Sequence, residues 1–131
     1  DLLINQFLIF SLVKKIIIKK KFDLFNDYWN PKIIGKINNH DVKLAKVKGE
    51  FVWHNHKNED ELFFIIKGKL IIEFHDKKVE LNEGEMLIVP KGVDHKPIAK
   101  EEVWLLLFEP NNIKHTGDVI SNLTVDKYEK I

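Results

Sequence analysis

The segment WHNHKNEDELFFIIKG, residues 53–68, concentrates side chains that bind metal ions. His54 and His56 are two positions apart, so on a β-strand both side chains point to the same face. Glu61 follows after a short polar loop, and His95 follows the Pro/Gly turn of PKGVDH, so each can add a ligand from a neighbouring strand. Three imidazoles and one carboxylate predict a site for one divalent transition metal per chain, and Fe, Mn, Zn, Ni and Cu all accept this set.

Several polar residues beside these four leave alternatives open. Asp60 is an alternative carboxylate ligand next to Glu61, while Glu59 and Asp94 flank the ligands as candidate acid–base groups. Charged loop residues are more often simply solvated. The remaining histidines are expected to be surface or hydrogen-bonded residues: His40, His75 and His115. Three lysines near the rim can attract an anion or be solvated: Lys57, Lys91 and Lys96.

The composition limits the chemistry further. A chain of 131 residues fits one domain with a real core. It has no Cys, which excludes disulfides, iron–sulfur clusters and thiolate zinc sites. All 21 basic residues are Lys, so bidentate capture of phosphate or carboxylate by Arg is excluded. The net charge of +1 predicts no nucleic-acid surface.

The first 21 residues are apolar and then basic, the reverse of the order in a secretory signal. Their apolar run is shorter than the roughly 20 residues that a membrane helix needs. We therefore expect residues 1–21 to be an appended leader or an extra edge strand, with no membrane anchor and a cytoplasmic location. Residues 22–131 are expected to form one domain.

The rest of the chain has the pattern of an all-β protein with a short N-terminal helical turn. FDLFNDYW places Phe22, Phe25 and Trp29 on one face of a helical turn, and Pro31 ends that turn. KIIGKI and VKLAKVK, joined by the turn NNHD, predict a hairpin. Further strands are predicted between turn signals at residues 51–56, 61–67, 69–75, 78–81, 86–89 and 103–109. Many short strands without βαβ alternation predict an antiparallel sandwich or a small antiparallel β-barrel.

Strand alternation also predicts what surrounds the ligands. Val52 should face inward with His54, while Phe51 and Trp53 should face away. The same alternation and the apolar pattern give an apolar pocket lining: Val52, Phe63, Ile65, Met86 and Ile88, with Trp104 or Phe108 as further candidates. Core packing accounts for these residues equally well.

The motifs resemble the two conserved motifs of the cupin superfamily, over about residues 33–110. The first motif is matched by Gly49, His54, His56, Glu61 and Gly68, and the second by Gly84, Pro90, Gly92 and His95. Gly49 lies one position closer to His54 than the first motif requires. Ala99 stands at the position where the second motif has Asn. Some related cupins place the fourth ligand at the position of Asp60. The resemblance implies a jelly-roll barrel (a double-stranded β-helix) with the metal inside, and a homodimer. Within the superfamily the chain most resembles the small single-domain cupins that are labelled mannose-6-phosphate isomerase-like.

Three functions fit these expectations. The first is a metal-dependent enzyme of isomerase or oxygenase type that acts on a small organic molecule. The second is a non-catalytic module, such as a sensor or accessory protein, that binds a small molecule or the metal. The third is an interaction protein in which the metal only stabilises the folded barrel. The nearly continuous apolar run ELFFIIKGKLIIEF supports self-association in each case.

Overall fold

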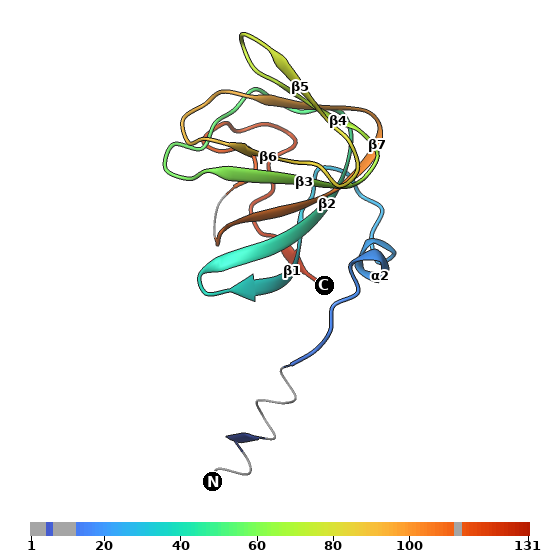
Figure 1. Cartoon of the computed structure of the whole chain (residues 1–131). Coiled ribbons are helices and arrows are strands. Elements are labelled where there is room, and N and C mark those ends of the chain that lie inside the picture. The colour runs from blue at the N-terminus through green and yellow to red at the C-terminus, as the bar shows by residue number, and fades with distance from the viewer. Residues whose placement is uncertain (1–4, 7–12, 112–113) are drawn as a thin grey trace.

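A computed structural model of the chain describes residues 5–6, 13–111 and 114–131. It is an antiparallel β-barrel preceded by the short helix α2, and the sequence predicts this fold class (Figure 1). The elements are α2 (Ile18–Phe22), β1 (Lys32–Ile37), β2 (His40–Glu50), β3 (Glu61–Lys67), β4 (Leu70–Glu73), β5 (Lys78–Leu81), β6 (Met86–Val89), β7 (Lys96–Pro110) and β8 (Glu129–Lys130).

Strand β7 organises the barrel because it pairs with three other strands. It runs antiparallel to β2 along nearly its whole length, from the pair Asp41–Glu109 to the pair Glu50–Ile98. On its other edge, β4 pairs with the first part of β7 and β3 pairs with the later part. The ladder with β2 shifts register between Val47 and Gly49, where β7 carries extra residues. Such an irregularity bends a strand, and here it lets β7 pass from one side of the barrel to the other.

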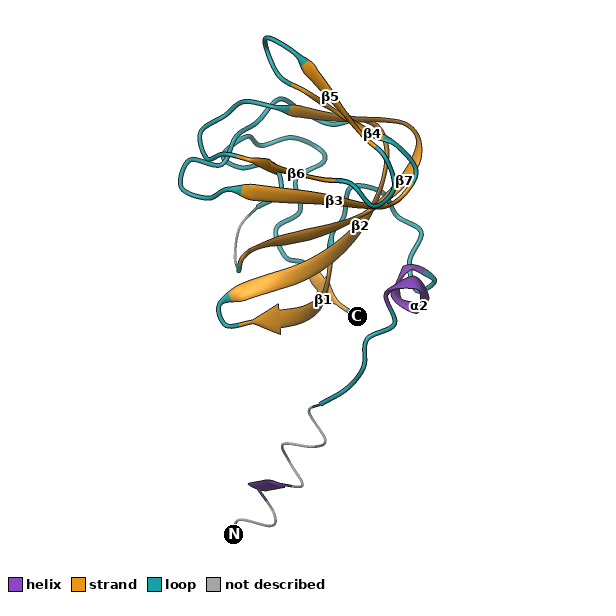
Figure 2. Ribbon diagram, viewed as in Figure 1, coloured by secondary structure: helices purple, strands orange, loops and turns teal. Residues whose placement is uncertain are grey.

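The interior of the barrel is filled by alternate side chains of its strands. Its buried apolar residues are Ala45, Val47, Phe63, Ile65, Leu70, Ile72, Leu81, Val89, Ala99, Val103, Leu105 and Leu107. A second cluster lies on the outer face of β2, where Leu44 packs with Phe22 and Phe25 from the N-terminal segment. Strand β2 is therefore buried on both faces, because α2 and the turn after it cover the face that would otherwise meet water (Figure 2).

Most of the strands predicted from the sequence are confirmed. β3, β5 and β6 have the predicted bounds, β4 is shorter, and β7 begins earlier, at Lys96. The strand predicted for residues 51–56 is wrong, because after Glu50 the chain leaves the ladder and keeps only one bridge, between His54 and His95. The hairpin of β1 and β2 is confirmed, and its turn residue Asn38 has the left-handed φ of 54° that Asn tolerates.

The prediction of an N-terminal helical turn needs a correction. The helix spans Ile18–Phe22 and is followed by a turn at residues 23–24, whereas Phe25 and Trp29 lie outside any helix. Phe22 and Phe25 are nonetheless buried, and Phe22 stacks on Trp104 with ring centroids 4.7 Å apart. The described residues 13–21 contain no strand, whereas residues 1–4 and 7–12 of the predicted edge strand or leader lie outside the described residues.

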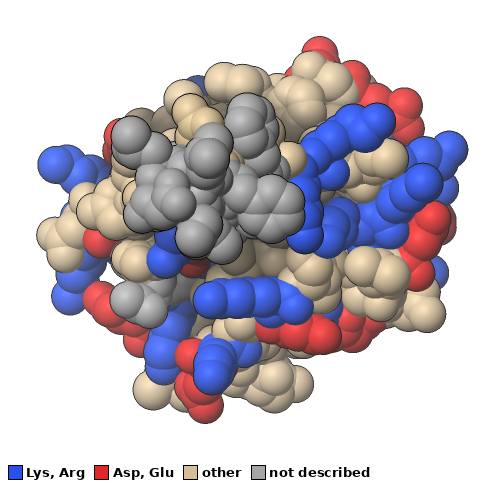
Figure 3. Space-filling view, turned by 90° about the horizontal axis from the view of Figure 1, so that it is seen from below, with Lys and Arg blue, Asp and Glu red and all other residues tan. Residues whose placement is uncertain are grey.

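The surface carries charges of both signs. On the face seen in Figure 3, lysine and acidic side chains are interspersed, in keeping with the net charge of +1. Within the part of the chain that the structure describes, no helix is long and apolar enough to cross a membrane.

Candidate metal centre

Backbone hydrogen bonds bring two distant loops together at the centre. The N–H of His54 donates to the carbonyl of His95 at 3.0 Å, and the N–H of His95 donates to the carbonyl of His54 at 2.9 Å. The N–H of Gly92 donates to the carbonyl of His56 at 2.8 Å. Glu61, the first residue of β3, then approaches from the adjacent strand. The two histidine loops thus have a fixed register although neither belongs to a regular strand there.

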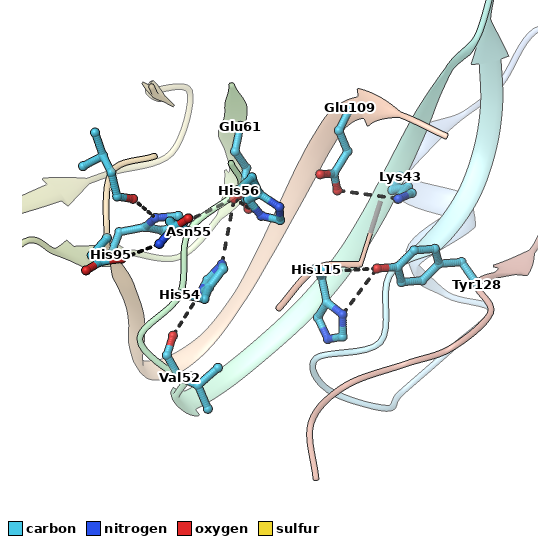
Figure 4. Close-up of polar contacts among 12 residues, drawn as sticks. Lys43, Val52, His54, Asn55, His56, Glu61, His95, Glu109, His115 and Tyr128 are labelled. Atoms are coloured by element: carbon cyan, nitrogen blue, oxygen red, sulfur yellow. Dashed lines mark hydrogen bonds and ion pairs between the residues drawn. The ribbon is translucent and has the colours of Figure 1, made fainter. Parts of the chain in front are cut away.

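All four predicted ligands converge inside the barrel (Figure 4). The Oε2 atom of Glu61 lies 2.7 Å from His56 Nε2, 3.3 Å from His95 Nε2 and 3.9 Å from His54 Nε2. Atoms of His54, Glu61 and His95 lie within 4.8 Å of one another, and His56 reaches the group through Glu61. Each of the four residues is at most 5% exposed.

The rings of His54 and His95 are oriented through their Nδ1 atoms. Nδ1 of His54 lies 2.9 Å from the carbonyl oxygen of Val52, and Nδ1 of His95 lies 3.0 Å from that of Val93. A carbonyl only accepts hydrogen bonds, so Nδ1 carries the proton in each ring and the lone pair is left on Nε2. This is the arrangement in which histidine binds a metal ion.

The chemistry of the donor set fits a divalent cation. Nε2 of His54, His56 and His95 and Oε2 of Glu61 are buried and have no well-aligned hydrogen-bond partner among the described residues, despite the short His56–Glu61 contact. Buried polar atoms without partners are costly and uncommon in folded proteins. An ion bound by these atoms would remove that cost, and imidazole with carboxylate suits Fe, Mn, Zn, Ni or Cu.

The protonation states of Glu61 and His54 also suit a cation, whereas the raised pKa of His56 favours a proton that a bound ion would displace. Burial by itself raises the pKa of Glu61, but its contacts with His56 and His95 outweigh burial and lower that pKa to about 2. Burial lowers the pKa of His54 to about 4, against the attraction of Glu61. Burial also opposes a charge on His56, but contact with Glu61 raises the His56 pKa. At neutral pH Glu61 is therefore ionised and His54 is neutral, as metal binding requires.

The alternative polar residues do not join this group. Asp60 is exposed and accepts the backbone N–H of Lys91 at 3.0 Å. Asp94 is exposed and accepts the amide of Asn55 at 2.6 Å, which ties the two histidine loops together from outside. Glu59 is half-buried. The geometry therefore favours Glu61 over Asp60 as the carboxylate of the centre.

The predicted lining is only partly correct. Phe63 and Ile65 are buried in the interior, and Val52 is half-buried. Met86 and Ile88, however, are 54% and 52% exposed. They pair with Phe64 and Leu62 on β3, and directly paired residues point to the same face. Glu61 and Phe63 point inward, so the alternate residues Leu62 and Phe64 point outward. Their partners Ile88 and Met86 point outward with them.

The predicted orientations of the aromatic residues near the centre also need correction. Phe51, predicted to face away, is buried and meets the ring of His54 edge-on at a centroid distance of 5.3 Å. Trp104 stacks on Phe22, and Phe108 stacks on His40, so both lie on the other face of β7. Trp53 is outside the pocket as predicted, stacked on the exposed ring of His75.

Among the polar residues that the sequence prediction missed, Lys43, Glu109 and His115 are buried and Tyr128 is half-buried. Lys43 shares the inward face of β2 with Ala45 and Val47, and Glu109 shares that of β7 with Leu107. That alternation could have placed both in the interior. His115 and Tyr128 come from the segment after β7, where no periodic pattern marks them, and the Tyr128 hydroxyl accepts the backbone N–H of His115 at 2.6 Å. Burial lowers the pKa of His115 to about 4 and raises that of Tyr128.

A small cavity adjoins the centre. It has a volume of about 30 Å³ and is bordered by His54, Glu61, Phe51, Phe63 and His115, among others. A single water needs roughly 10–15 Å³ of such volume, so the cavity holds one or two waters or a ligand of similar size.

Known proteins resemble this chain in both sequence and structure. The chain is 48% identical to a cupin-2 domain containing protein of Shewanella frigidimarina, whose crystal structure superposes with a TM-score of 0.73 over 73% of this chain and 94% of that one. It is 42% identical to the uncharacterized protein YdbB of Bacillus subtilis over 48% of this chain and 57% of that protein. It is 28% identical to the 3-hydroxyanthranilate 3,4-dioxygenase of Xenopus tropicalis over 77% of this chain and 39% of that protein.

The match covers less than two thirds of either of these two curated relatives. Residues 41–109 match the family described as Cupin domain, and they include β2 to β6, most of β7 and all four converging residues. The chain therefore belongs to the cupin domain family.

Proposed function

We propose that this chain binds one divalent transition metal through His54, His56, Glu61 and His95. The observation that carries the proposal is the convergence of four buried ligand atoms without well-aligned hydrogen-bond partners among the described residues. The backbone contacts of His54 and His95 hold the rings, and ionised Glu61 offsets the charge of the ion. Burial then keeps bulk water away from the bound ion.

We further propose that the metal serves a reaction of oxygenase type on a small organic molecule. A bound ion would supply Lewis-acid or redox chemistry. The similarity to a 3-hydroxyanthranilate 3,4-dioxygenase supports an oxygenase over an isomerase. The absence of Arg argues against a sugar phosphate, because Lys alone cannot make the bidentate contacts that phosphate recognition often uses. Phe51 and Phe63 would exclude water from the cavity in which the ligand meets the ion.

A non-catalytic metal-binding or sensor cupin is the second candidate. The small cavity of about 30 Å³ at the centre favours it, because substrate pockets are usually at least about 300 Å³. We also propose a cytoplasmic homodimer. The exposed Met86 and Ile88 on β6, which pairs only with β3 among the described strands, support self-association.

Elemental analysis of the purified protein, followed by oxygen uptake, tests these proposals. We expect about one iron or manganese ion per chain, and oxygen consumption when the loaded protein meets a panel of enolisable and dihydroxylated small molecules. Stoichiometric metal without oxygen uptake on any compound would favour the second candidate. Failure to retain any metal after reconstitution would contradict both.

A further inference from the structure

A buried ion pair lies in the barrel apart from the four converging residues. Lys43 on β2 is 0% exposed and Glu109 on β7 is 2% exposed. The Nζ atom of Lys43 is 3.5 Å from Oε1 of Glu109, and neither atom has a hydrogen-bond partner among the residues that the structure describes. The ring of Tyr128 covers Nζ at 4.0 Å.

Packing does not explain this pair. Two charges in a protein interior cost free energy unless their attraction and further hydrogen bonds compensate, and this pair lacks such hydrogen bonds. Apolar residues of similar size usually serve a core at least as well. The two charges have each other as partners but lack hydrogen bonds, and a bound ligand would supply those hydrogen bonds.

The pair faces the metal centre. Figure 4 shows Glu109 between Lys43 and the group formed by His56 and Glu61, with β2 and β7 as the wall that carries the pair. Neither residue of the pair borders the small cavity at the centre. A ligand that extends from the metal toward this wall would reach Glu109 before Lys43.

We propose that Lys43 and Glu109 bind a hydroxyl or enol group of the small molecule that occupies the barrel. The ammonium of Lys43 only donates hydrogen bonds, and an ionised Glu109 only accepts them. A hydroxyl oxygen beside both can accept from Lys43 and donate to Glu109, so it satisfies both unpartnered atoms at once. A carboxylate ligand would leave Glu109 without a donor. This inference deepens the proposed function, because it assigns the polar end of the ligand that the metal would bind.

Access to the pair depends on the segment after β7. The ring of Tyr128 covers Nζ of Lys43, and the Tyr128 hydroxyl oxygen accepts a hydrogen bond from the backbone N–H of His115 at 2.6 Å. His115 in turn borders the small cavity at the metal centre. A ligand atom that reaches Nζ of Lys43 from this side would have to displace the ring of Tyr128.

Calorimetric titration at pH 8 with glycolate and acetate tests the inference, because these two carboxylates differ by one hydroxyl group. The proteins are the full chain and two double variants, each analysed for metal content after reconstitution. Lys43→Met with Glu109→Leu replaces the buried pair by apolar residues of similar size, an exchange that folded proteins often tolerate. Lys69→Met with Glu80→Leu is the matched control, because that pair lies 3.2 Å apart on the surface.

We expect the wild type and the surface control to bind glycolate at least about tenfold more tightly than acetate, since hydrogen bonds to charged groups contribute that much. The buried-pair variant should lose this preference and keep its metal. A preference that survives in that variant would come from chelation by the metal and would overturn the inference, as would a wild type with no preference. A wild type that takes up no metal but prefers glycolate through the buried pair would contradict the proposed metal function and support the inference.

Discussion

Replacing His95 by alanine removes one of the four converging side chains and leaves the barrel strands intact. The His95 ring donates to Val93 and lies 3.3 Å from Glu61, so the metal-free variant also loses packing and one hydrogen bond. Its own stability should fall by about 1–3 kcal/mol, as for other buried polar truncations. The informative quantity is therefore the additional stability that metal gives to each protein.

That quantity follows from the linkage between binding and folding. At a free metal concentration 100 times the dissociation constant, bound metal stabilises the wild type by about 2.7 kcal/mol. Loss of one ligand that weakens binding by about 100-fold leaves only about 0.4 kcal/mol at the same concentration. At roughly 4 °C per kcal/mol for a domain of this size, the metal-induced rise in Tm should drop from about 10 °C to about 2 °C.

Differential scanning calorimetry with and without metal measures both rises. His75→Ala is the matched control, because His75 is 69% exposed and contacts Trp53 and Asp94 outside the centre, so its metal-induced rise should equal that of the wild type. A wild-type rise in the His95→Ala variant would refute the assigned ligand set. So would an equal loss in the His75→Ala control.

Three further changes test other parts of the structure. Glu61→Gln should abolish stoichiometric metal binding while Asp60→Asn preserves it, as elemental analysis can show; the reverse result would move the ligand to Asp60. Gly68→Ala should lower the free energy of unfolding in urea by about 3 kcal/mol or more, because its Cβ would lie 2.7 Å from a backbone oxygen at a φ of +89°. Gly84→Ala, at a φ of +79° with no atom within 4 Å, should cost only about 1–2 kcal/mol, and equal costs would contradict the contact argument. The pKa of Glu109 is raised from 4.5 to about 7 by burial, so the folded state binds its proton more tightly than the unfolded state does. The metal-free protein should therefore lose up to about 3 kcal/mol of stability between about pH 4.5 and 7, and Glu109→Gln should flatten that profile in urea titrations at each pH.

The sequence by itself predicted the fold class and which residues converge. Alternating apolar residues between turn signals gave the bounds of β3, β5 and β6, because strand periodicity is a local property of the chain. The spacing of His54, His56 and Glu61 also pointed to one site, although the strand expected to carry the two histidines is absent. Residue types then restricted the chemistry to imidazole and carboxylate donors.

The tertiary structure decided which face of each strand lies inside. Met86 and Ile88 alternate as the sequence predicts, but their pairing with outward residues of β3 turns them to the surface. Phe51 meets His54 although they are not on a common strand, because the chain leaves the ladder after Glu50. Periodicity cannot specify these outcomes, since strand partners are distant in sequence.

The same reason explains why the buried pair and its cover were not predicted. Lys43 and Glu109 come from the two strands that form the longest ladder, and Tyr128 reaches them from the end of the chain. Each residue alone is typical of a surface. Only closure of the barrel excludes water from Lys43 and Glu109, and so only the tertiary structure turns two ordinary charged positions into a candidate ligand site.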